Sequence, residues 1–341
     1  MSKNNNTLKT LRVGAVQVQS SLGQTQSNLE HATPFIEEAA RQEAQIICLP
    51  ELAAPGYAMS PLLWDFGETR QGLTVAWTSE TARRLGVYLG CGFLEADGED
   101  FFNSYVVCRP DGKVACIVRK TMAETGIFKC ACGPNVIPSE LGVIGLGICA
   151  DNMFAPLARQ MQEASVDLML MPHAVPAPFK VGGLVSQADI EGIRRRSGHK
   201  AEQYAHLLGV PSVYINAVGP RSAEKWLGLI GGAIKPESWR LLGLSAIADS
   251  DGSLKAQMDE LSEGIIVAEV TLDPARKLSS LPKIYGRYGG GTFDAHTPIQ
   301  EALLYTDATY GRLYYRLSAQ RKRKALAVSG GRRERLEPGF V

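Results

Sequence analysis

An apolar run that ends in a cysteine is the feature that most constrains this chain. Residues 141–148 are all apolar or glycine, Cys149 follows them directly, and Asp151 stands two residues further on. A run of this length between polar residues suits a buried strand. Open α/β sheets place ligands at the carboxyl ends of their strands, which is where Cys149 would lie. The cysteine is therefore either a nucleophile or a buried thiol, and a buried thiol is the commoner role.

Strand-like and helix-like segments alternate along most of the chain. The expected strands span residues 11–18, 44–50, 87–94, 103–108, 114–119, 141–148, 167–171, 210–218, 241–248 and 264–271. The expected helices span residues 24–45, 73–85, 156–165 and 187–208, and the first of these is expected to begin near Pro34. This alternation predicts a layered α/β domain. Asp111-Gly112 between two apolar runs predicts a hairpin, so the sheets should be mixed.

Composition and charge restrict the class of protein. The net charge of the 341 residues is only +1, so no overall field favours a nucleic-acid partner. The first residues lack the apolar stretch of a signal peptide, and no run approaches the roughly 18 apolar residues that span a bilayer. The seven cysteines contain no Cys-x-x-Cys pair, and the five histidines show no metal-ligand spacing. We therefore expect a cytoplasmic protein with reduced thiols, no metal and no membrane partner.

The end of the chain differs in charge from the rest. Residues 312–335 contain nine Lys or Arg and a single acidic residue, Glu334. This bias allows a tail that binds a polyanion or an extension that contacts another subunit. No aromatic residues are interleaved with the basic ones after Tyr315, which favours the second interpretation. We expect a domain at residues 1–280 followed by a basic, subunit-contacting extension at residues 281–341.

Three chemically active residues each follow an expected strand. Glu51, Lys120 and Cys149 stand at three such carboxyl ends, and parallel neighbours would bring those ends to one rim. A carboxylate can take the proton of a thiol, and an ammonium group can stabilise a developing oxyanion. Each residue alone is weak evidence, because a Glu or Lys at a strand end is commonly a solvated cap. Their order and contexts are more specific.

These contexts resemble the nitrilase superfamily of carbon–nitrogen hydrolases. Leu49-Pro50-Glu51 is similar to the family's glutamate motif, Arg119-Lys120 to its lysine motif, and Gly147-Ile148-Cys149-Ala150-Asp151 to its cysteine motif. The resemblance extends over residues 10–275, in the family's order and spacing. It implies a four-layer α-β-β-α sandwich, and a homodimer or higher homo-oligomer that associates through helices.

The resemblance also implies a reaction and a set of site residues. It implies hydrolysis of a small amide through a Cys149 thioester, with Glu51 and Lys120 assisting and no metal or organic cofactor. Glu124, in the loop after Lys120, is the candidate for a second glutamate that recurs in the family. The expected substrate-binding residues are Tyr57, Ala150, Asn152, Phe154 and His173.

Departures from the family pattern bear on the substrate. Ala150-Asp151 stands where nitrilases usually carry Trp-Glu, so an amide is favoured over a nitrile. Asn152-Met153 offers no cation where carbamoylases of amino acids place arginines. Ala155-Pro156 replaces the Pro-Glu of many members. Nitrile hydrolysis, N-carbamoyl hydrolysis and acyl transfer to an amine remain alternatives on the same site, and a non-catalytic scaffold is the alternative of another class.

Overall fold

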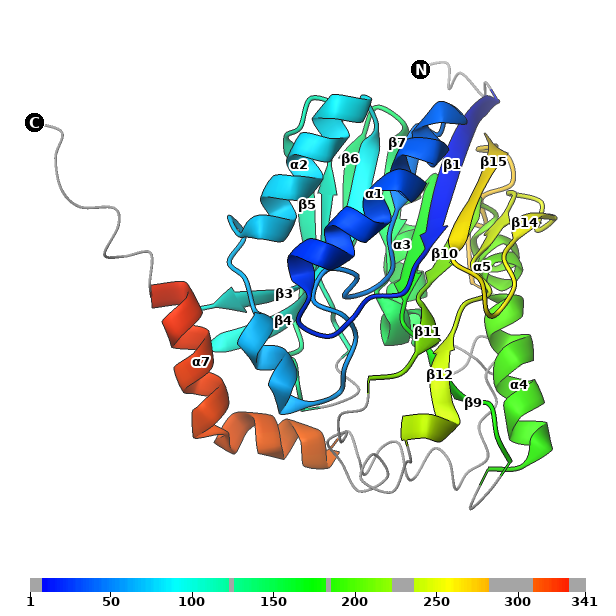
Figure 1. Cartoon of the computed structure of the whole chain (residues 1–341). Helices are drawn as coiled ribbons and strands as arrows, with labels where there is room; N and C mark the ends of the chain where they lie inside the picture. The colour runs from blue at the N-terminus through cyan, green and yellow to red at the C-terminus, as the bar shows by residue number, and fades with distance from the viewer. Residues whose placement is uncertain (1–7, 123–125, 182–184, 223–235, 282–308, 331–341) are drawn as a thin grey trace, which may run out of the picture.

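Two six-stranded sheets pack face to face in this protein (Figure 1). The structure is a computed structural model that describes residues 8–122, 126–181, 185–222, 236–281 and 309–330. The first sheet has the order β15 (Gly264–Leu272), β1 (Lys9–Gln17), β2 (Ile46–Cys48), β3 (Tyr88–Asp97), β4 (Asp100–Cys108) and β5 (Val114–Arg119). The second has the order β14 (Leu254–Gln257), β13 (Ala246–Ala248), β10 (Ser212–Asn216), β8 (Leu168–His173), β7 (Gly142–Leu146) and β6 (Val136–Ser139).

Helices cover the outer face of each sheet. The first sheet carries α1 (Thr25–Arg41) and α2 (Leu73–Leu85), and the second carries α3 (Ala155–Glu163) and α5 (Lys200–Leu208). Strand β8 shows why the layers form, because successive side chains of a strand point to opposite faces. Leu168 and Leu170 enter the core between the sheets, whereas Met169 and Met171 pack under the helices. The predicted four-layer α-β-β-α sandwich is confirmed.

Smaller elements complete the described chain. A three-stranded sheet has the order β11 (Val218–Pro220), β12 (Trp239–Leu242) and β9 (Pro176–Pro178). Helix α4 (Gln187–Gly198) precedes α5, and the 3-10 helices η1 (Pro61–Phe66), η2 (Cys149–Met153) and η4 (Pro236–Ser238) lie in connections. Residues 309–317 are helical and α7 (Ala319–Gly330) follows them. Among the described residues, no helix has the length and apolar character needed to cross a membrane.

Three expectations about local structure were wrong. The first helix begins at Thr25 and continues through Pro34, because the proline lies on the exposed side while Leu29, Ala32 and Ile36 are buried. The hydrogen bond that proline removes therefore falls where water can replace it. The expected helix over residues 187–208 is two helices, and the expected strand over 241–248 divides into β12 and β13.

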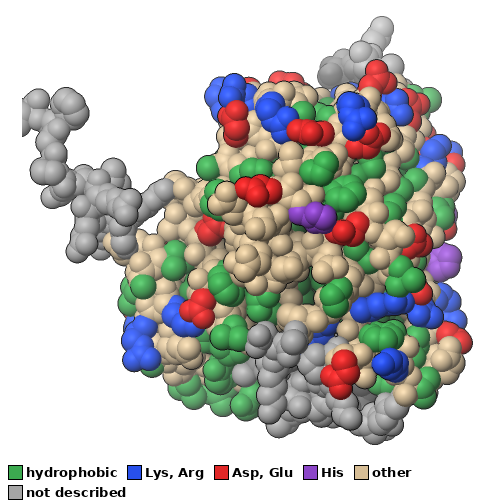
Figure 2. All heavy atoms as spheres, viewed as in Figure 1, with side chains coloured by type: hydrophobic (Ala, Val, Ile, Leu, Met, Phe, Trp, Pro, Cys, Tyr) green, Lys and Arg blue, Asp and Glu red, His purple; other side chains and the backbone are tan. Residues whose placement is uncertain are grey.

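The direction of the strands explains where a site can form. Strands β1, β2 and β3 are parallel, and two successive antiparallel pairings turn β5 back into the direction of β3. In the second sheet β7, β8 and β10 are parallel. The carboxyl ends of β2 and β5 therefore lie at one edge of the first sheet. On the face in Figure 2, acidic and basic side chains are interspersed, in keeping with the near-zero net charge.

The turn after β2 rests directly on β3. Leu52 has φ +49°, and a Cβ added to Gly92 of β3 would lie 2.3 Å from Leu52 N and 2.7 Å from Pro50 O. Ala54 N also donates a hydrogen bond to Gly92 O at 3.1 Å. Only glycine at position 92 allows this approach, so β3 sets the position of the turn that contains Glu51.

We predict that Gly92→Ala lowers the free energy of unfolding by about 1–3 kcal/mol, because the added methyl group overlaps main-chain atoms that cannot move without displacing the turn. Gly14→Ala in β1 is the matched control, since its Cβ would lie 3.4 Å from the Ala44 side chain, an ordinary contact. Urea unfolding of both variants is the measurement. Equal stability of the two would contradict this account of the turn.

Candidate active site

Glu51 and Lys120 form a buried ion pair. Glu51 follows β2 and Lys120 follows β5, and Lys120 Nζ donates to Glu51 Oε1 at 2.7 Å. Each residue is only 1% exposed. Asn103 Nδ2 donates to the same carboxylate oxygen at 2.7 Å, and Lys120 N donates to Asn103 O at 2.8 Å. A buried ion pair needs such additional hydrogen bonds, because removal of two charges from water is costly. Asn103 therefore holds both partners in register.

The second oxygen of the Glu51 carboxylate, Oε2, differs from Oε1 in its hydrogen bonding. Within the described ranges, Glu51 Oε2 is buried and has no hydrogen-bond partner. Buried carboxylate oxygens are normally hydrogen-bonded, so an exception calls for an explanation. This oxygen can accept a hydrogen bond or a proton from a group that enters the site.

Cys149 is the first residue of η2, in the constrained turn that follows β7. Its φ is +49°, in the left-handed region that residues other than glycine rarely adopt, and it is 9% exposed. Such backbone conformations persist where the surrounding structure imposes them, and they are frequent at functional sites. Ala150 follows directly and is also buried. The structure thus holds the thiol in a specific orientation at the end of the predicted apolar strand.

Asp151 joins the cysteine turn to the end of β5. Its Oδ1 accepts hydrogen bonds from Thr121 N at 3.0 Å, Thr121 Oγ1 at 2.8 Å and Met122 N at 2.7 Å. Its Oδ2 accepts from Ile148 N at 3.1 Å. Burial raises the pKa of Asp151 to about 6, against the opposing effects of Lys120 and these donors. The residue after Lys120 and the residue before Cys149 are therefore bonded to one carboxyl group.

Glu51, Lys120 and Cys149 do not follow strands of one sheet. Parallel neighbours in one sheet were expected to bring Glu51, Lys120 and Cys149 together. Glu51 and Lys120 belong to the first sheet, whereas Cys149 follows β7 of the second sheet. The three segments approach one another because the two sheets face each other, with Asp151 as the link.

Asn152 and His173 form a buried network behind this turn. Asn152 Nδ2 lies 2.7 Å from Gly147 O and 3.0 Å from His173 Nε2, and Tyr204 Oη donates to Asn152 O at 2.8 Å. Burial and the nearby charges of Lys200 and Lys120 lower the pKa of His173, so the imidazole is neutral and Nε2 accepts the amide hydrogen. This burial favours a bracing role for both residues over the predicted contact with substrate.

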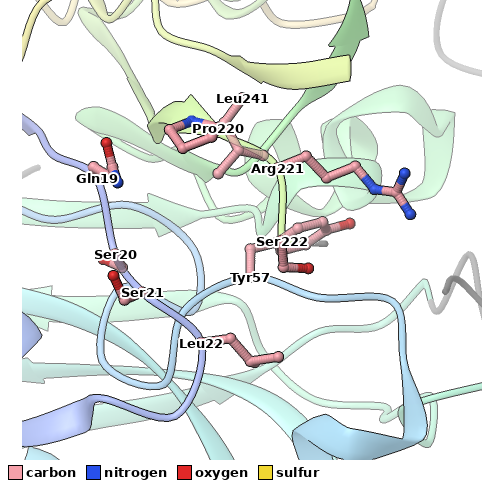
Figure 3. Close-up of a pocket in the computed structure, with 9 residues that line it drawn as sticks. All are labelled: Gln19, Ser20, Ser21, Leu22, Tyr57, Pro220, Arg221, Ser222 and Leu241. Atoms are coloured by element: carbon pink, nitrogen blue, oxygen red, sulfur yellow. The ribbon is translucent and has the colours of Figure 1, made fainter. Parts of the chain in front are cut away.

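Tyr57 follows Glu51 in the sequence, and Phe154 follows Cys149. Phe154 is half-buried where α3 begins, and Tyr57 is 6% exposed in the loop that follows Glu51. Tyr57 lines a cavity of about 250 Å³ shown in Figure 3. The other lining residues are Gln19, Ser20, Ser21, Leu22, Pro220, Arg221, Ser222 and Leu241.

Neither Arg221 nor Asn103 was assigned a site role from the sequence, although Asn103 belongs to the segment that resembles the lysine motif. Arg221 is 5% exposed, and burial lowers its pKa to about 10 against the opposing effect of Tyr57. An isolated arginine gives no periodic or spacing signal in a sequence. Asn103 stands within a strand, where polar residues that face a site and those that face solvent look alike. Glu124 lies outside the described residues, so its placement stays a prediction. In the described part of the chain, no three His, Cys, Asp or Glu side chains are grouped to hold a metal ion.

Comparison with known proteins decides the family. Residues 12–279 match the family model described as carbon-nitrogen hydrolase. The chain belongs to the carbon–nitrogen hydrolase family. It is 26% identical over 259 residues to the N-carbamoylputrescine amidase of Arabidopsis thaliana, covering 72% of this chain and 82% of that protein. It is 29% identical over 179 residues to a nitrilase of Pyrococcus abyssi, covering 50% of this chain and 67% of the relative.

Solved structures of the carbon–nitrogen hydrolase family share the fold. A carbon-nitrogen hydrolase from Helicobacter pylori superimposes with a TM-score of 0.67 at 24% identity, over 78% of this chain and 90% of that chain. The family match over residues 12–279 confirms the resemblance to the nitrilase superfamily read from the three motifs. The relatives include proteins named for different substrates, so membership alone leaves the substrate of this chain open.

We predict that His173 makes the stability of this carbon–nitrogen hydrolase depend on pH. Below about pH 6.5 the unfolded chain protonates this histidine while the folded chain does not, so stability is lost as the pH falls. His173→Gln should lack this component. Urea unfolding from pH 7.5 to pH 5 measures it, with His206→Gln on the exposed side of α5 as control. An unchanged acid response in His173→Gln would contradict the buried, neutral imidazole.

Proposed function

We propose that this chain hydrolyses a small non-peptide amide through a thioester on Cys149. The observation that supports it is the buried Glu51–Lys120 ion pair, which Asp151 connects to the strained turn of Cys149. A base, a cation and a nucleophile on separate rigid segments are the groups that amide hydrolysis needs.

In the first half-reaction, Glu51 accepts the thiol proton through its second oxygen as Cys149 Sγ attacks the carbonyl carbon. The negative charge that develops on the carbonyl oxygen is stabilised by the Lys120 ammonium group and by the Ala150 N–H. Removal of one such donor typically lowers the rate by about 10²–10³-fold. Protonated Glu51 then gives its proton to the leaving nitrogen. The C–N bond breaks, ammonia or an amine departs, and the acyl group stays on sulfur.

In the second half-reaction, Glu51 takes a proton from water as the water oxygen attacks the thioester carbonyl. The same two donors stabilise the second oxyanion. Collapse of this intermediate breaks the C–S bond, returns a proton to the cysteine sulfur and releases the carboxylic acid. The proposed part of Glu124 is to hold the carbonyl group or the attacking water in line.

Residues beside the cysteine favour an amide among the substrates of this family. Ala150-Asp151 replaces the Trp-Glu pair expected of nitrilases, and the carboxyl group of Asp151 is occupied by hydrogen bonds from the neighbouring loop. Asn152, the next residue, is uncharged, and its side chain is hydrogen-bonded to Gly147 O and His173 Nε2 behind the cysteine turn. Neither position offers the groups associated with nitriles or with carbamoyl amino acids.

Product analysis separates the remaining reactions of the same site. A primary amide yields acid and ammonia, an N-carbamoyl substrate yields an amine, ammonia and carbon dioxide, and transfer to an added amine yields a new amide instead of acid. A non-catalytic scaffold yields none of these products.

We predict that Cys149→Ala abolishes ammonia release from a panel of small aliphatic and aromatic amides, a loss of roughly 10⁴-fold or more, because the nucleophile acts as a unit with its base. Cys132→Ala, which removes an exposed thiol, is the matched control and should keep wild-type turnover. Retained turnover in the Cys149 variant would end the thioester mechanism. Detection of the acyl adduct on Cys149 by intact-mass measurement would support it directly.

We predict that Glu51→Gln lowers kcat/KM by about 10²–10⁴-fold, because the amide keeps the shape of the carboxyl group but cannot accept the thiol proton. Iodoacetamide labelling of Cys149 at neutral pH should slow in the same variant. Glu95→Gln controls for loss of a buried charge, since Glu95 is fully buried in β3 and pairs with Arg119 and Arg70. Comparable losses in both variants would indicate a structural role for Glu51.

A further inference from the structure

The C-terminal helices, defined here as residues 309–317 and α7, lie against β3, β4 and η1 (Figure 1). We propose that these helices position the chain segment that follows the loop after Lys120 and is hydrogen-bonded back to Lys120. They would thereby set the geometry of the reaction. This segment, residues 126–131, is called the return segment. The inference rests on the proposed function for its effect on turnover. The contacts that carry it stand independently of that function.

The return segment is bonded to the main chain of Lys120. Ala131 N donates to Lys120 O at 3.1 Å, so the segment closes the loop where that loop began. On the other side of Lys120, Thr121 is held by Asp151 of the cysteine turn. A displacement of the return segment therefore acts on the residue proposed to stabilise the oxyanion.

One contact between the C-terminal helices and the return segment joins two glycines. A Cβ added to Gly126 would lie 2.0 Å from Gly311 O and 2.5 Å from Gly311 C. A side chain at position 126 would overlap the Gly311 main chain, so the close approach of the two segments requires glycine there. Neither partner is a flexible side chain that could move aside.

An aromatic stack also contacts the return segment. Trp64 of η1 is fully buried, and its Nε1 donates to Ile127 O at 2.8 Å. Tyr314 of the C-terminal helices and Phe101 of β4 each stack with this indole, with ring centroids 6.3 and 6.2 Å away. Tyr314 thus contributes to the position of the ring that binds the return segment.

The main chain of Phe101 forms a third connection between the C-terminal helices and the return segment. Phe101 N donates to Tyr315 Oη at 2.8 Å, and Phe101 O accepts from Lys129 N at 2.9 Å. Tyr315 belongs to the C-terminal helices and is 6% exposed, and Lys129 belongs to the return segment. One residue of β4 therefore holds both.

Ion pairs within the same chain hold the C-terminal helices against the β3–β4 hairpin and η1. Arg321 pairs with Asp100 at 2.5 Å and its guanidinium lies 4.2 Å from the centre of the Tyr315 ring. Lys322 pairs with Glu99 at 2.7 Å and Lys324 with Asp65 at 2.5 Å. Part of the basic charge noted in the sequence is therefore used to seat these helices on acidic residues of the β3–β4 hairpin and η1.

Gly126→Ala tests the inference against Gly133→Ala, because a Cβ added at Gly133 meets no atom within 4 Å. Displacement of reacting groups by about 1 Å can lower a rate by about 10²-fold. We expect kcat of Gly126→Ala to fall by about that factor with KM much less affected. Hydrogen–deuterium exchange without substrate should become faster in both peptides, 121–131 and 309–317. Gly133→Ala should match the wild type in every readout.

Tyr315→Phe, with Tyr310→Phe as control, decides the question if Gly126→Ala fails to fold. The first removes the hydroxyl that binds Phe101, and the second alters a tyrosine of the same helix that is 44% exposed. We expect Tyr315→Phe to lower kcat several-fold with faster exchange in the return segment, and Tyr310→Phe to do neither. Unchanged exchange in the return segment would overturn the proposal, as would faster exchange with wild-type kcat.

The two proposals fail in different ways. If Cys149→Ala retains turnover, the hydrolysis mechanism is wrong, and the exchange data still decide whether the C-terminal helices hold the return segment. If Cys149→Ala is inactive but Gly126→Ala behaves like Gly133→Ala, the hydrolysis proposal stands and the positioning role is refuted.

Discussion

A carboxylate and an ammonium group buried side by side impose the strictest requirement on this fold. The Glu51–Lys120 pair has almost no contact with solvent, so each charge depends on the other and on the Asn103 amide. Loss of either partner would leave an uncompensated charge in a medium that solvates it poorly. Both residues must therefore be anchored by strands, and β2 and β5 anchor them through a sheet whose β3 passes beneath the turn at Gly92.

The second sheet supplies what the first lacks. Its apolar inner face packs on the first sheet, and this packing brings the turn after β7 toward the ion pair. A single carboxyl group, that of Asp151, converts the approach into a hydrogen-bonded connection with the residues after Lys120. Behind the turn, the buried side chains of Asn152 and His173 are hydrogen-bonded to each other, and Asn152 also donates to Gly147 O. The proposed nucleophile is therefore oriented by backbone strain and polar contacts that its own strand does not provide.

The C-terminal helices lie outside the sandwich but are also connected to the segments that hold the proposed site. They contribute no residue to the proposed chemistry, yet they contact the segment that returns to Lys120 through a glycine pair, an aromatic stack and the Phe101 main chain. The charge that made this region distinctive in the sequence is partly neutralised by the chain's own acidic residues. The basic extension was expected from the sequence to contact another subunit, and within the described residues its helices pack against acidic residues of the same chain.

Local patterns in the sequence were sufficient for the layered α/β class, for α2 over residues 73–85 and for the hairpin at Asp111-Gly112, because hydrophobic period and turn chemistry act over a few residues. The motifs around Glu51, Lys120 and Cys149 were sufficient for the family. The passage of α1 through Pro34, the link made by Asp151 and the seat of the C-terminal helices depended on contacts between segments far apart in the chain. Burial and long-range hydrogen bonds arise only when those segments meet, so no window of sequence contains them.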